Sequence, residues 1–399
     1  MSKKKRGHMR IPFNKPYVTG NEFKYISEAI DRSHISGDGE FTKKCNAWLE
    51  ERLGTRKALL THSCTAALEM SAILAKIGPG DEVIMPSFTF VSTATAFALR
   101  GGVPVFVDIR PDTLNIDEAK IEEAMTPRTR AIVAVHYAGV GCEMEPIMEM
   151  AGRHGLFVIE DAAHGVLATY RGRQLGSFGH LGAVSFHETK NVISGEGGAI
   201  LVNDERYAER AEIIREKGTN RTKFFRGEIG KYEWVDIGSS YLPSDIIAAF
   251  LWAQLEEAES ITRRRLDIWE AYHTGFSGLE ERGLIRRPIV PGYCTHNAHM
   301  YYLLVEDLKT RTELIAHLNG DGIQAVFHYV PLHSSPAGRR YCRPSGGRKD
   351  AGGAGGAERL PATVEASSRL VRMPLWVGLG PEGVARVVES VERFFRYGR

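Results

Sequence analysis

The sequence predicts an α/β protein with a mostly parallel sheet flanked by helices, followed by a smaller α+β unit. Two observations lead to this prediction. Short apolar runs, such as those at 103–108 and 156–161, end at polar residues, which is typical of strands that are buried on both faces. Segments with helical spacing of apolar residues separate these runs, and strands that alternate with helices form parallel sheets.

The alternation of strands and helices extends to about residue 250, where the pattern changes. We therefore expect a large domain over residues 11–250 and a small C-terminal domain over residues 251–399. In the large domain, strands are expected at 82–86, 103–108, 131–137 and 156–161, and helices at 22–31, 93–100 and 207–217. A long helix over 244–277 is expected to connect the domains. The small domain is expected to have strands at 300–305 and 323–329 and helices at 311–319 and 383–397.

Composition limits the possible functions. The chain has 399 residues, of which 43% are hydrophobic and 25% are charged, so it can bury the cores of two domains. A formal net charge of +2 is too small to indicate binding to nucleic acid or to a membrane surface. Five cysteines without paired-motif spacing argue against a disulfide framework or a metal site and indicate a reducing, cytoplasmic compartment. No apolar run is long enough to predict a membrane span.

Two segments are expected to lie outside the folded core. Residues 1–10 are rich in lysine and arginine and lack the apolar stretch of a signal peptide. We interpret them as a basic arm or as the remnant of an expression tag. Residues 338–361 are rich in glycine, arginine and alanine, a composition that is typical of a flexible surface loop.

A lysine and an aspartate follow two of the expected strands. Asp161 ends the run at 156–161, and Lys190 follows a second apolar run that begins at Ala183. Because the carboxyl ends of parallel strands meet at one edge of a sheet, we expect both side chains to face one crevice. A single lysine beside glycines is more commonly a solvated loop charge, and only its combination with Asp161 favours a ligand site.

An amine and a carboxylate in one crevice fit the chemistry of pyridoxal phosphate. A lysine can hold the aldehyde of this cofactor as a Schiff base, and a carboxylate can keep the pyridine nitrogen protonated. Ser63, Cys64 and Thr65 begin a predicted helix, so their hydroxyl and backbone N–H groups can form the phosphate site that such a cofactor needs. Ordinary capping of the helix would use the same groups.

Further segments occur in the order and spacing of a known enzyme family. Among them are Glu-Asp-Ala-Ala-His at 160–164 and Ser-Phe-His-Glu-Thr-Lys-Asn at 185–191. The others lie at 11–14, 37–39, 86–93, 135–139, 215–220 and 331–333. On these segments, the chain from Ile11 to about Leu379 resembles the DegT/DnrJ/EryC1/StrS sugar aminotransferases, which are pyridoxal phosphate enzymes of fold type I. It is most similar to the dTDP-4-amino-4,6-dideoxygalactose transaminase group.

The resemblance implies roles for individual residues. Lys190 would form the Schiff base with pyridoxal phosphate, and Asp161 would pair with the pyridine nitrogen. Phe90 would stack on the cofactor ring and His164 would lie beside it, although each could equally be a core residue. The phosphate would be bound by residues with small polar side chains, namely Ser63, Cys64, Thr65, Ser185 and, from the partner subunit, Ser240.

A second set of residues is expected to contact the substrates. His333 follows an expected strand and could reach the sugar or its diphosphate, although a loop histidine without such a role is the simpler interpretation. Phe13 and Asn191, which belong to the matching segments, are expected in the same pocket. Metal ligands are not expected.

The chain departs from the family pattern in one segment. By this resemblance, many members have asparagine and arginine at the positions of Ser240 and Leu242. Leucine cannot bind an anion, so the anionic group of a substrate needs another cation. Arg226 and Lys231 are the candidates.

The resemblance implies a specific reaction. L-glutamate would donate its amino group to C4 of a dTDP-4-keto-6-deoxyhexose, with dTDP-4-keto-6-deoxy-D-glucose as the expected acceptor and a galacto or gluco product. The enzyme would be a cytoplasmic homodimer with shared active sites. Some relatives have histidine at the position of Lys190 and are dehydratases, so this lysine favours transamination. The alternatives are a sugar 3-aminotransferase, a related pyridoxal phosphate-dependent dehydratase or a non-catalytic cofactor-binding sensor.

Overall fold

The computed structural model describes residues 10–344 and 360–397. The expected N-terminal arm up to residue 9, and residues 345–359 of the expected surface loop, lie outside the described residues. Among the described residues, no helix is long and apolar enough to cross a membrane.

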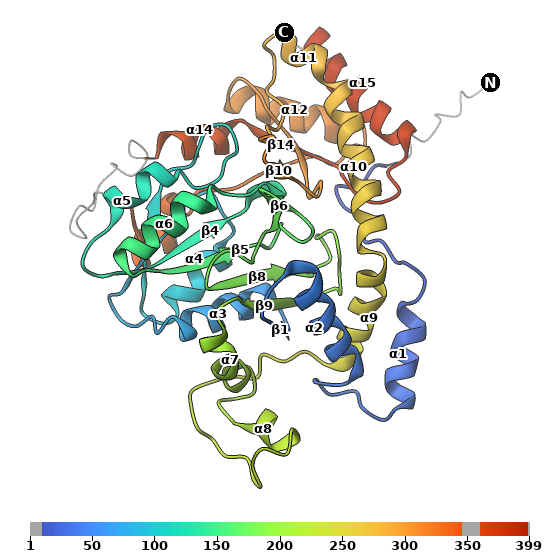
Figure 1. Ribbon diagram of the computed structural model, residues 1–399. Coiled ribbons are helices and arrows are strands. Elements are labelled where there is room, and N and C mark those ends of the chain that lie inside the picture. Colours follow the sequence, from blue (N-terminus) through green and yellow to red (C-terminus); the bar gives the residue numbers. More distant parts are fainter. Residues whose placement is uncertain (1–9, 345–359, 398–399) are drawn as a thin grey trace.

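An eight-stranded sheet forms the centre of the molecule (Figure 1), with the strand order β1-β9-β8-β5-β4-β2-β3-β13. Its strands are β1 (Lys57–Thr61), β2 (Glu82–Pro86), β3 (Val103–Val107), β4 (Thr129–Val135), β5 (Phe157–Asp161), β8 (Leu181–Ser185), β9 (Gly198–Val202) and β13 (Arg343–Pro344). Neighbouring strands are parallel except at β9, which is antiparallel to both β1 and β8. The prediction of a mostly parallel sheet is therefore confirmed.

Helices cover both faces of this sheet. Successive strand residues point to opposite faces, so Leu59 and Leu60 pack into two different hydrophobic clusters. The first face is covered by α1 (Glu22–Asp31), α2 (Glu40–Leu53), α5 (Ile121–Ala124), α6 (Met144–His154) and α9 (Asp245–Glu256). The second face is covered by α3 (Cys64–Leu74), α4 (Val91–Ala98) and α7 (Ala208–Arg215).

The C-terminal third forms a smaller α+β unit with its own hydrophobic cluster. Its antiparallel sheet has the order β11-β14-β12, formed by Tyr301–Leu304, Leu370–Met373 and Val326–Phe327. Ile11 also packs in this cluster, because it pairs with Ile323. The helices of this part are α10 (Ala258–Gly275), α11 (Ser277–Glu281), α12 (Leu308–Gly320), α13 (Pro336–Tyr341), α14 (Pro361–Arg369) and α15 (Pro381–Tyr397). The domain boundary at residue 250 stays a prediction.

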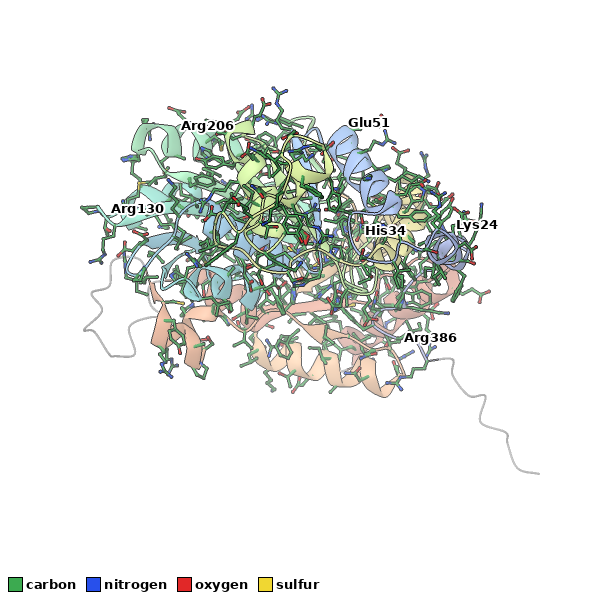
Figure 2. All side chains as sticks on the ribbon, turned by 90° about the horizontal axis from the view of Figure 1, so that it is seen from below. Lys24, His34, Glu51, Arg130, Arg206 and Arg386 are labelled. Atoms are coloured by element: carbon green, nitrogen blue, oxygen red, sulfur yellow. The ribbon has the colours of Figure 1, made fainter. Side chains whose placement is uncertain are left out.

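The remaining elements lie at the margins of the fold. β6 (Thr169–Tyr170), β7 (Arg173–Gln174) and β10 (Cys294–Thr295) form a small sheet. α8 (Arg221–Phe225) belongs to a projecting segment, residues 217–240, that leaves the body of the molecule (Figure 1). Charged side chains such as Lys24, Glu51, Arg130 and Arg206 are exposed on different sides of the molecule (Figure 2), so these charges do not form one patch.

Three expectations for local structure were wrong in part. The helix expected over 244–277 is two helices, α9 and α10, that meet at Glu257. The chain changes its packing partner there, because α9 packs against the large sheet and α10 packs in the C-terminal cluster. The strand expected at 323–329 is confined to the two residues of β12.

The third correction concerns the beginning of the glycine-rich segment. Residues 338–344 belong to α13 and β13 instead of a flexible loop. Ser335 caps α13 by accepting a hydrogen bond from the N–H of Gly338, and Pro336 follows the cap, which favours a helix start. Strand β13 is fixed because Arg343 forms an ion pair of 2.6 Å with the buried carboxylate of Glu82.

Candidate active site

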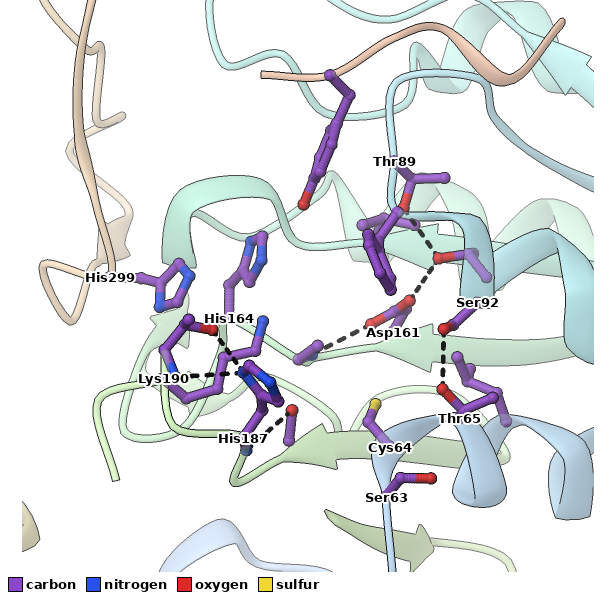
Figure 3. A pocket seen from close by; sticks show the side chains of 18 of the residues that line it. Ser63, Cys64, Thr65, Thr89, Ser92, Asp161, His164, His187, Lys190 and His299 are labelled. Atoms are coloured by element: carbon purple, nitrogen blue, oxygen red, sulfur yellow. Dashed lines mark hydrogen bonds between the residues drawn. The ribbon is translucent and has the colours of Figure 1, made fainter. Parts of the chain in front are cut away.

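A pocket of about 630 Å³ lies at the carboxyl ends of the parallel strands (Figure 3). The last residues of three strands line it, namely Val135 of β4, Asp161 of β5 and Ser185 of β8. Lys190, which follows β8 by five positions, lines the same pocket. The structure thus brings Lys190 and Asp161 together at the edge where open α/β sheets bind ligands.

The carboxylate of Asp161 is held in one orientation by hydrogen bonds. The hydroxyl of Thr93 donates to Oδ2 at 2.7 Å, and the backbone N–H of Ala163 donates to Oδ1 at 3.2 Å. Thr89 Oγ1 lies 2.9 Å from Thr93 Oγ1 and must be the donor, since the proton of Thr93 already points to Asp161. The two hydroxyls thus hold the carboxylate of Asp161 in a fixed position at the pocket (Figure 3).

Lys190 has an amine that loses its proton easily. Burial within the protein lowers the pKa of Lys190 from 10.5 to about 8, although the nearby Cys64 and Asp161 oppose this shift. The charge of Arg372 lowers the pKa further. The unprotonated amine, which a nucleophile or a general base requires, is therefore far more abundant near neutral pH than in an ordinary lysine and becomes half of the total near pH 8.

The lowered pKa of Lys190 leads to a prediction for the cofactor-free protein. Only an unprotonated amine attacks an aldehyde, so covalent attachment of pyridoxal phosphate should accelerate as pH rises and become half-maximal near pH 8. Stopped-flow absorbance over a pH series measures this rate. A midpoint near 10.5, the ordinary value for lysine, would contradict the burial of the reacting amine.

Small residues form a polar corner at another part of the pocket. Gly198 of β9 pairs with Thr61 of β1 and with Ser185 of β8, so these strands bring Ser185 next to the start of α3. Ser63 caps α3, and its hydroxyl accepts a hydrogen bond of 3.1 Å from the N–H of Ala66. The first turn of a helix leaves N–H groups free for an anion.

The start of α3 can lie close against β9 only because residue 198 is glycine. A Cβ atom there would lie 2.4 Å from the backbone nitrogen of Cys64 and 2.5 Å from the carbonyl carbon of Ser63. Thr65 lines this corner as well and donates a hydrogen bond of 2.8 Å to Ser92 Oγ. Hydroxyls, backbone N–H groups and a helix N-terminus fit the phosphate of pyridoxal phosphate, while Lys190 and Asp161 fit its aldehyde and ring nitrogen.

Gly198→Ala tests this corner. The added methyl group must push the start of α3 away, so we expect the dissociation constant of pyridoxal phosphate to rise at least about fivefold, from an overpacking cost of ~1–3 kcal/mol. Fluorescence titration with the cofactor measures the change. Gly152→Ala is the matched control, because a Cβ atom at Gly152 meets no heavy atom within 4 Å. Equal affinities in the two variants would show that the corner does not hold the phosphate.

Two stacked histidines form one wall of the pocket. The rings of His164 and His299 lie 4.1 Å apart at 16°, and burial lowers the pKa of both well below 6.5. The N–H of Ala138 donates to Nδ1 of His164. Asn191 donates its amide N–H to the carbonyl of Asn297, so its oxygen accepts a hydrogen bond from Nδ1 of His299. Asn191 is therefore buried behind this wall and orients His299.

Of the remaining expected site residues, some line the pocket and others do not. Phe90 lies at the rim of the pocket with 58% of its surface exposed. The imidazole of His333 does not line the pocket, and its Nδ1 is hydrogen-bonded to the hydroxyl of Ser87 at 2.7 Å. Phe13 packs against Arg372, whose guanidinium carbon lies 4.8 Å from the centroid of the Phe13 ring. Arg372 does line the pocket.

The other candidates lie on or next to the projecting segment. Arg226 forms ion pairs with Glu212 and Glu228, at 3.0 and 2.6 Å. Lys231 and Ser240 are exposed. None of these three lines the pocket of its own chain, so their roles in binding stay predictions.

Several pocket residues were not found from the sequence. Thr89 and Thr93 belong to a segment that matches the family, and their spacing of four positions at a helix start was a usable signal. His299, His328 and Tyr329 had no local signal. Further residues that line the pocket are Leu68, Ser92, Ala163, His187, Thr189, Glu196 and Gly197.

Fold and pocket together define the class of protein, a pyridoxal phosphate-dependent transferase of fold type I. The chain belongs to the DegT/DnrJ/EryC1/StrS aminotransferase family, whose model matches residues 16–392.

Relatives in sequence agree with this assignment. The spore coat polysaccharide biosynthesis protein SpsC of Bacillus subtilis (strain 168) is 35% identical over 397 residues, which cover 97% of each chain. The GDP-perosamine synthase of Caulobacter vibrioides is 37% identical over 331 residues, which cover 82% of this chain and 86% of the relative.

A solved structure has the same fold. The putative sugar aminotransferase Spr1654 of Streptococcus pneumoniae, in its PLP form, aligns with a TM-score of 0.86 and 26% identity and covers 96% of this chain and 98% of its own. Its PMP form gives the same TM-score with 27% identity over the same shares of the two chains. The protein is thus a pyridoxal phosphate-dependent sugar aminotransferase.

Proposed function

We propose that the protein transfers the amino group of L-glutamate to C4 of dTDP-4-keto-6-deoxy-D-glucose. The products are 2-oxoglutarate and a dTDP-4-amino-4,6-dideoxyhexose. The observation that supports this proposal best is the common pocket of Lys190 and Asp161 in the fold of a sugar aminotransferase. One lysine can serve both half-reactions, because the same amine can take up and release the proton that moves in each of them.

The geometry of the pocket supports the following roles for the residues that would hold the cofactor. Ser63, Thr65 and Ser185 would bind the phosphate together with backbone N–H groups at the start of α3. Asp161 would pair with the pyridine nitrogen, and Lys190 would hold the aldehyde. Bound pyridoxal phosphate supplies an electron sink for the charge that develops at the α-carbon of the amino donor.

Lys190 moves the protons of both half-reactions. Its Nζ takes the proton from the α-carbon of the donor and, in the second half-reaction, delivers a proton to C4 of the sugar. A pKa of about 8 lets the same amine act as base and as acid near neutral pH. The face from which the proton reaches C4 sets the galacto or gluco configuration.

The experiment that tests this function is NMR of the product formed from L-glutamate and dTDP-4-keto-6-deoxy-D-glucose. A primary amine at C4 is the expected result, and the couplings of H4 distinguish the two configurations. No reaction with this acceptor, together with amination of a dTDP-3-keto-6-deoxyhexose, would favour the 3-aminotransferase alternative. Loss of a hydroxyl without gain of nitrogen would favour the dehydratase.

A GDP-linked acceptor is the second candidate, because a relative of 37% identity is a GDP-perosamine synthase. The comparison needs kcat/KM for the dTDP- and GDP-linked forms of a 4-keto-6-deoxyhexose under the same conditions. We expect the higher kcat/KM with the dTDP-linked sugar. A higher kcat/KM with the GDP-linked sugar would favour the second candidate.

We further propose a cytoplasmic homodimer in which the projecting segment reaches the partner's pocket. Apolar side chains on this segment are exposed in the single chain, among them Phe225 at 69% and Trp234 at 79%. So large an exposure of aromatic surface favours an interface. Sedimentation velocity is expected to give twice the chain mass of 44.2 kDa, and a monomer that remains fully active would contradict the shared site.

A further inference from the structure

Arg372 points from the C-terminal unit into the pocket. Its neighbours in strand β14, Val371 and Met373, are buried in the hydrophobic cluster of that unit. Because successive residues of a strand point to opposite faces, Arg372 points away from this cluster, and its side chain lines the pocket. The position is thus set by the register of the small sheet.

The guanidinium of Arg372 has no anionic partner among residues 10–344 and 360–397. No carboxylate of these residues lies within ion-pair distance, and Nε is buried without a hydrogen-bond partner. Nη1 lies 3.5 Å from Nε2 of His328, and burial keeps that imidazole neutral by lowering its pKa well below 6.5. The ring of Phe13 packs 4.8 Å from the guanidinium. A buried charge without a counter-charge is unfavourable, so the site favours an anionic ligand.

The other charges of the pocket have different tasks in the proposed function. Asp161 is bound by Thr93 and faces the ring nitrogen of the cofactor. The phosphate belongs to the corner at Ser63 and Ser185, at the start of α3. A second buried arginine, Arg265, donates to two backbone carbonyls and does not line the pocket. Among the residues of this chain that the structure describes in the pocket, Arg372 therefore remains as the cation that is free to bind a substrate.

We propose that Arg372 binds the α-carboxylate of the amino donor, and that Phe13 and His328 hold its guanidinium in place. This proposal rests on the proposed function. The α-carboxylate is bonded directly to the carbon from which Lys190 takes a proton, so it must lie deep in the pocket, near both residues. The diphosphate of the sugar nucleotide is several bonds from C4 and reaches outward instead. A planar guanidinium also matches a carboxylate with two parallel hydrogen bonds.

The test uses the holoenzyme and the variants Arg372→Met and Arg372→Lys. Arg286→Met is the matched control, because Arg286 also has buried guanidinium nitrogens without partners but does not line the pocket. Three quantities are measured, namely the dissociation constant of glutarate by calorimetry, the glutamate concentration for half-maximal loss of the cofactor absorbance band, and the rate at which the keto sugar restores that band. Circular dichroism checks that each variant is folded.

In Arg372→Met, glutarate and glutamate are expected to bind about 100-fold more weakly, while the sugar half-reaction stays within about twofold of the wild type. Arg372→Lys keeps the charge without the planar fork, so about a tenfold loss is expected. Arg286→Met should behave as the wild type. Equal effects of Arg372→Met and Arg286→Met, or a loss confined to the sugar half-reaction, would overturn the proposal. A wild-type enzyme that binds glutarate but does not react with glutamate would contradict the proposed donor and not the role of Arg372.

Discussion

Lys190→Ala is expected to abolish both half-reactions, with a loss of turnover of at least about 10⁴-fold. The variant lacks the amine that bonds to the cofactor and the base that moves the proton at the substrate carbon. Within the described residues that line the pocket, no other lysine is available to replace it. The rate of 2-oxoglutarate formation from glutamate and the keto sugar measures the loss.

Lys44→Ala is the matched control for this variant. Lys44 is 38% exposed, forms an ion pair with the exposed Glu40 and does not line the pocket. Its removal should leave turnover within about twofold of the wild type, because an exposed ion pair contributes little. Transamination that persists in Lys190→Ala at more than about a hundredth of the wild-type rate would mean that another group moves the proton.

Asp161→Asn is expected to retain the cofactor but to lower turnover about 10³-fold. An amide has nearly the shape of a carboxylate, yet it has no charge to hold a proton on the ring nitrogen, so the ring withdraws electrons less strongly. The absorbance of the purified variant reports on cofactor binding, and single-turnover kinetics with glutamate report on the chemical step. A rate near that of the wild type would show that a different carboxylate pairs with the ring.

Thr93→Val separates the charge of Asp161 from its orientation. The carboxylate remains, but it loses the hydrogen bond of 2.7 Å from the Thr93 hydroxyl. A hydrogen bond to a charged group contributes ~1.5–3 kcal/mol, so we expect a fall of at least about tenfold in the single-turnover rate, smaller than in Asp161→Asn. If Thr93→Val were the more severe of the two, the hydroxyl itself would have a catalytic role.

The large sheet could be predicted from the sequence because its signals are local. The strand at 82–86 has the expected bounds, and the run that ends at Asp161 is a buried parallel strand. The prediction that Asp161 and Lys190 share one pocket followed from one topological rule, that the carboxyl ends of parallel strands lie at the same edge of the sheet. That rule needs no knowledge of tertiary contacts.

Arg372 could not be found in this way, because its position depends on contact between distant segments. Locally it is one charged residue in the strand at 370–373, where solvent exposure would be the usual expectation. Only the packing of the small sheet against the pocket, with Phe13 from the N-terminal segment, buries it. The same reason applies to the contact of Asn191 with His299, which is formed by bonds across more than one hundred positions. The role of Asn191 in substrate binding stays a prediction.

The most direct test of the central role of Lys190 is to reduce the holoenzyme with borohydride and to map the labelled peptide by mass spectrometry. Borohydride makes the bond between a lysine amine and the cofactor aldehyde permanent. We predict a single pyridoxyl group on Lys190 and none in Lys190→Ala. Label on another lysine, or equal labelling of the wild type and Lys190→Ala, would contradict the site that is described around Lys190 and Asp161.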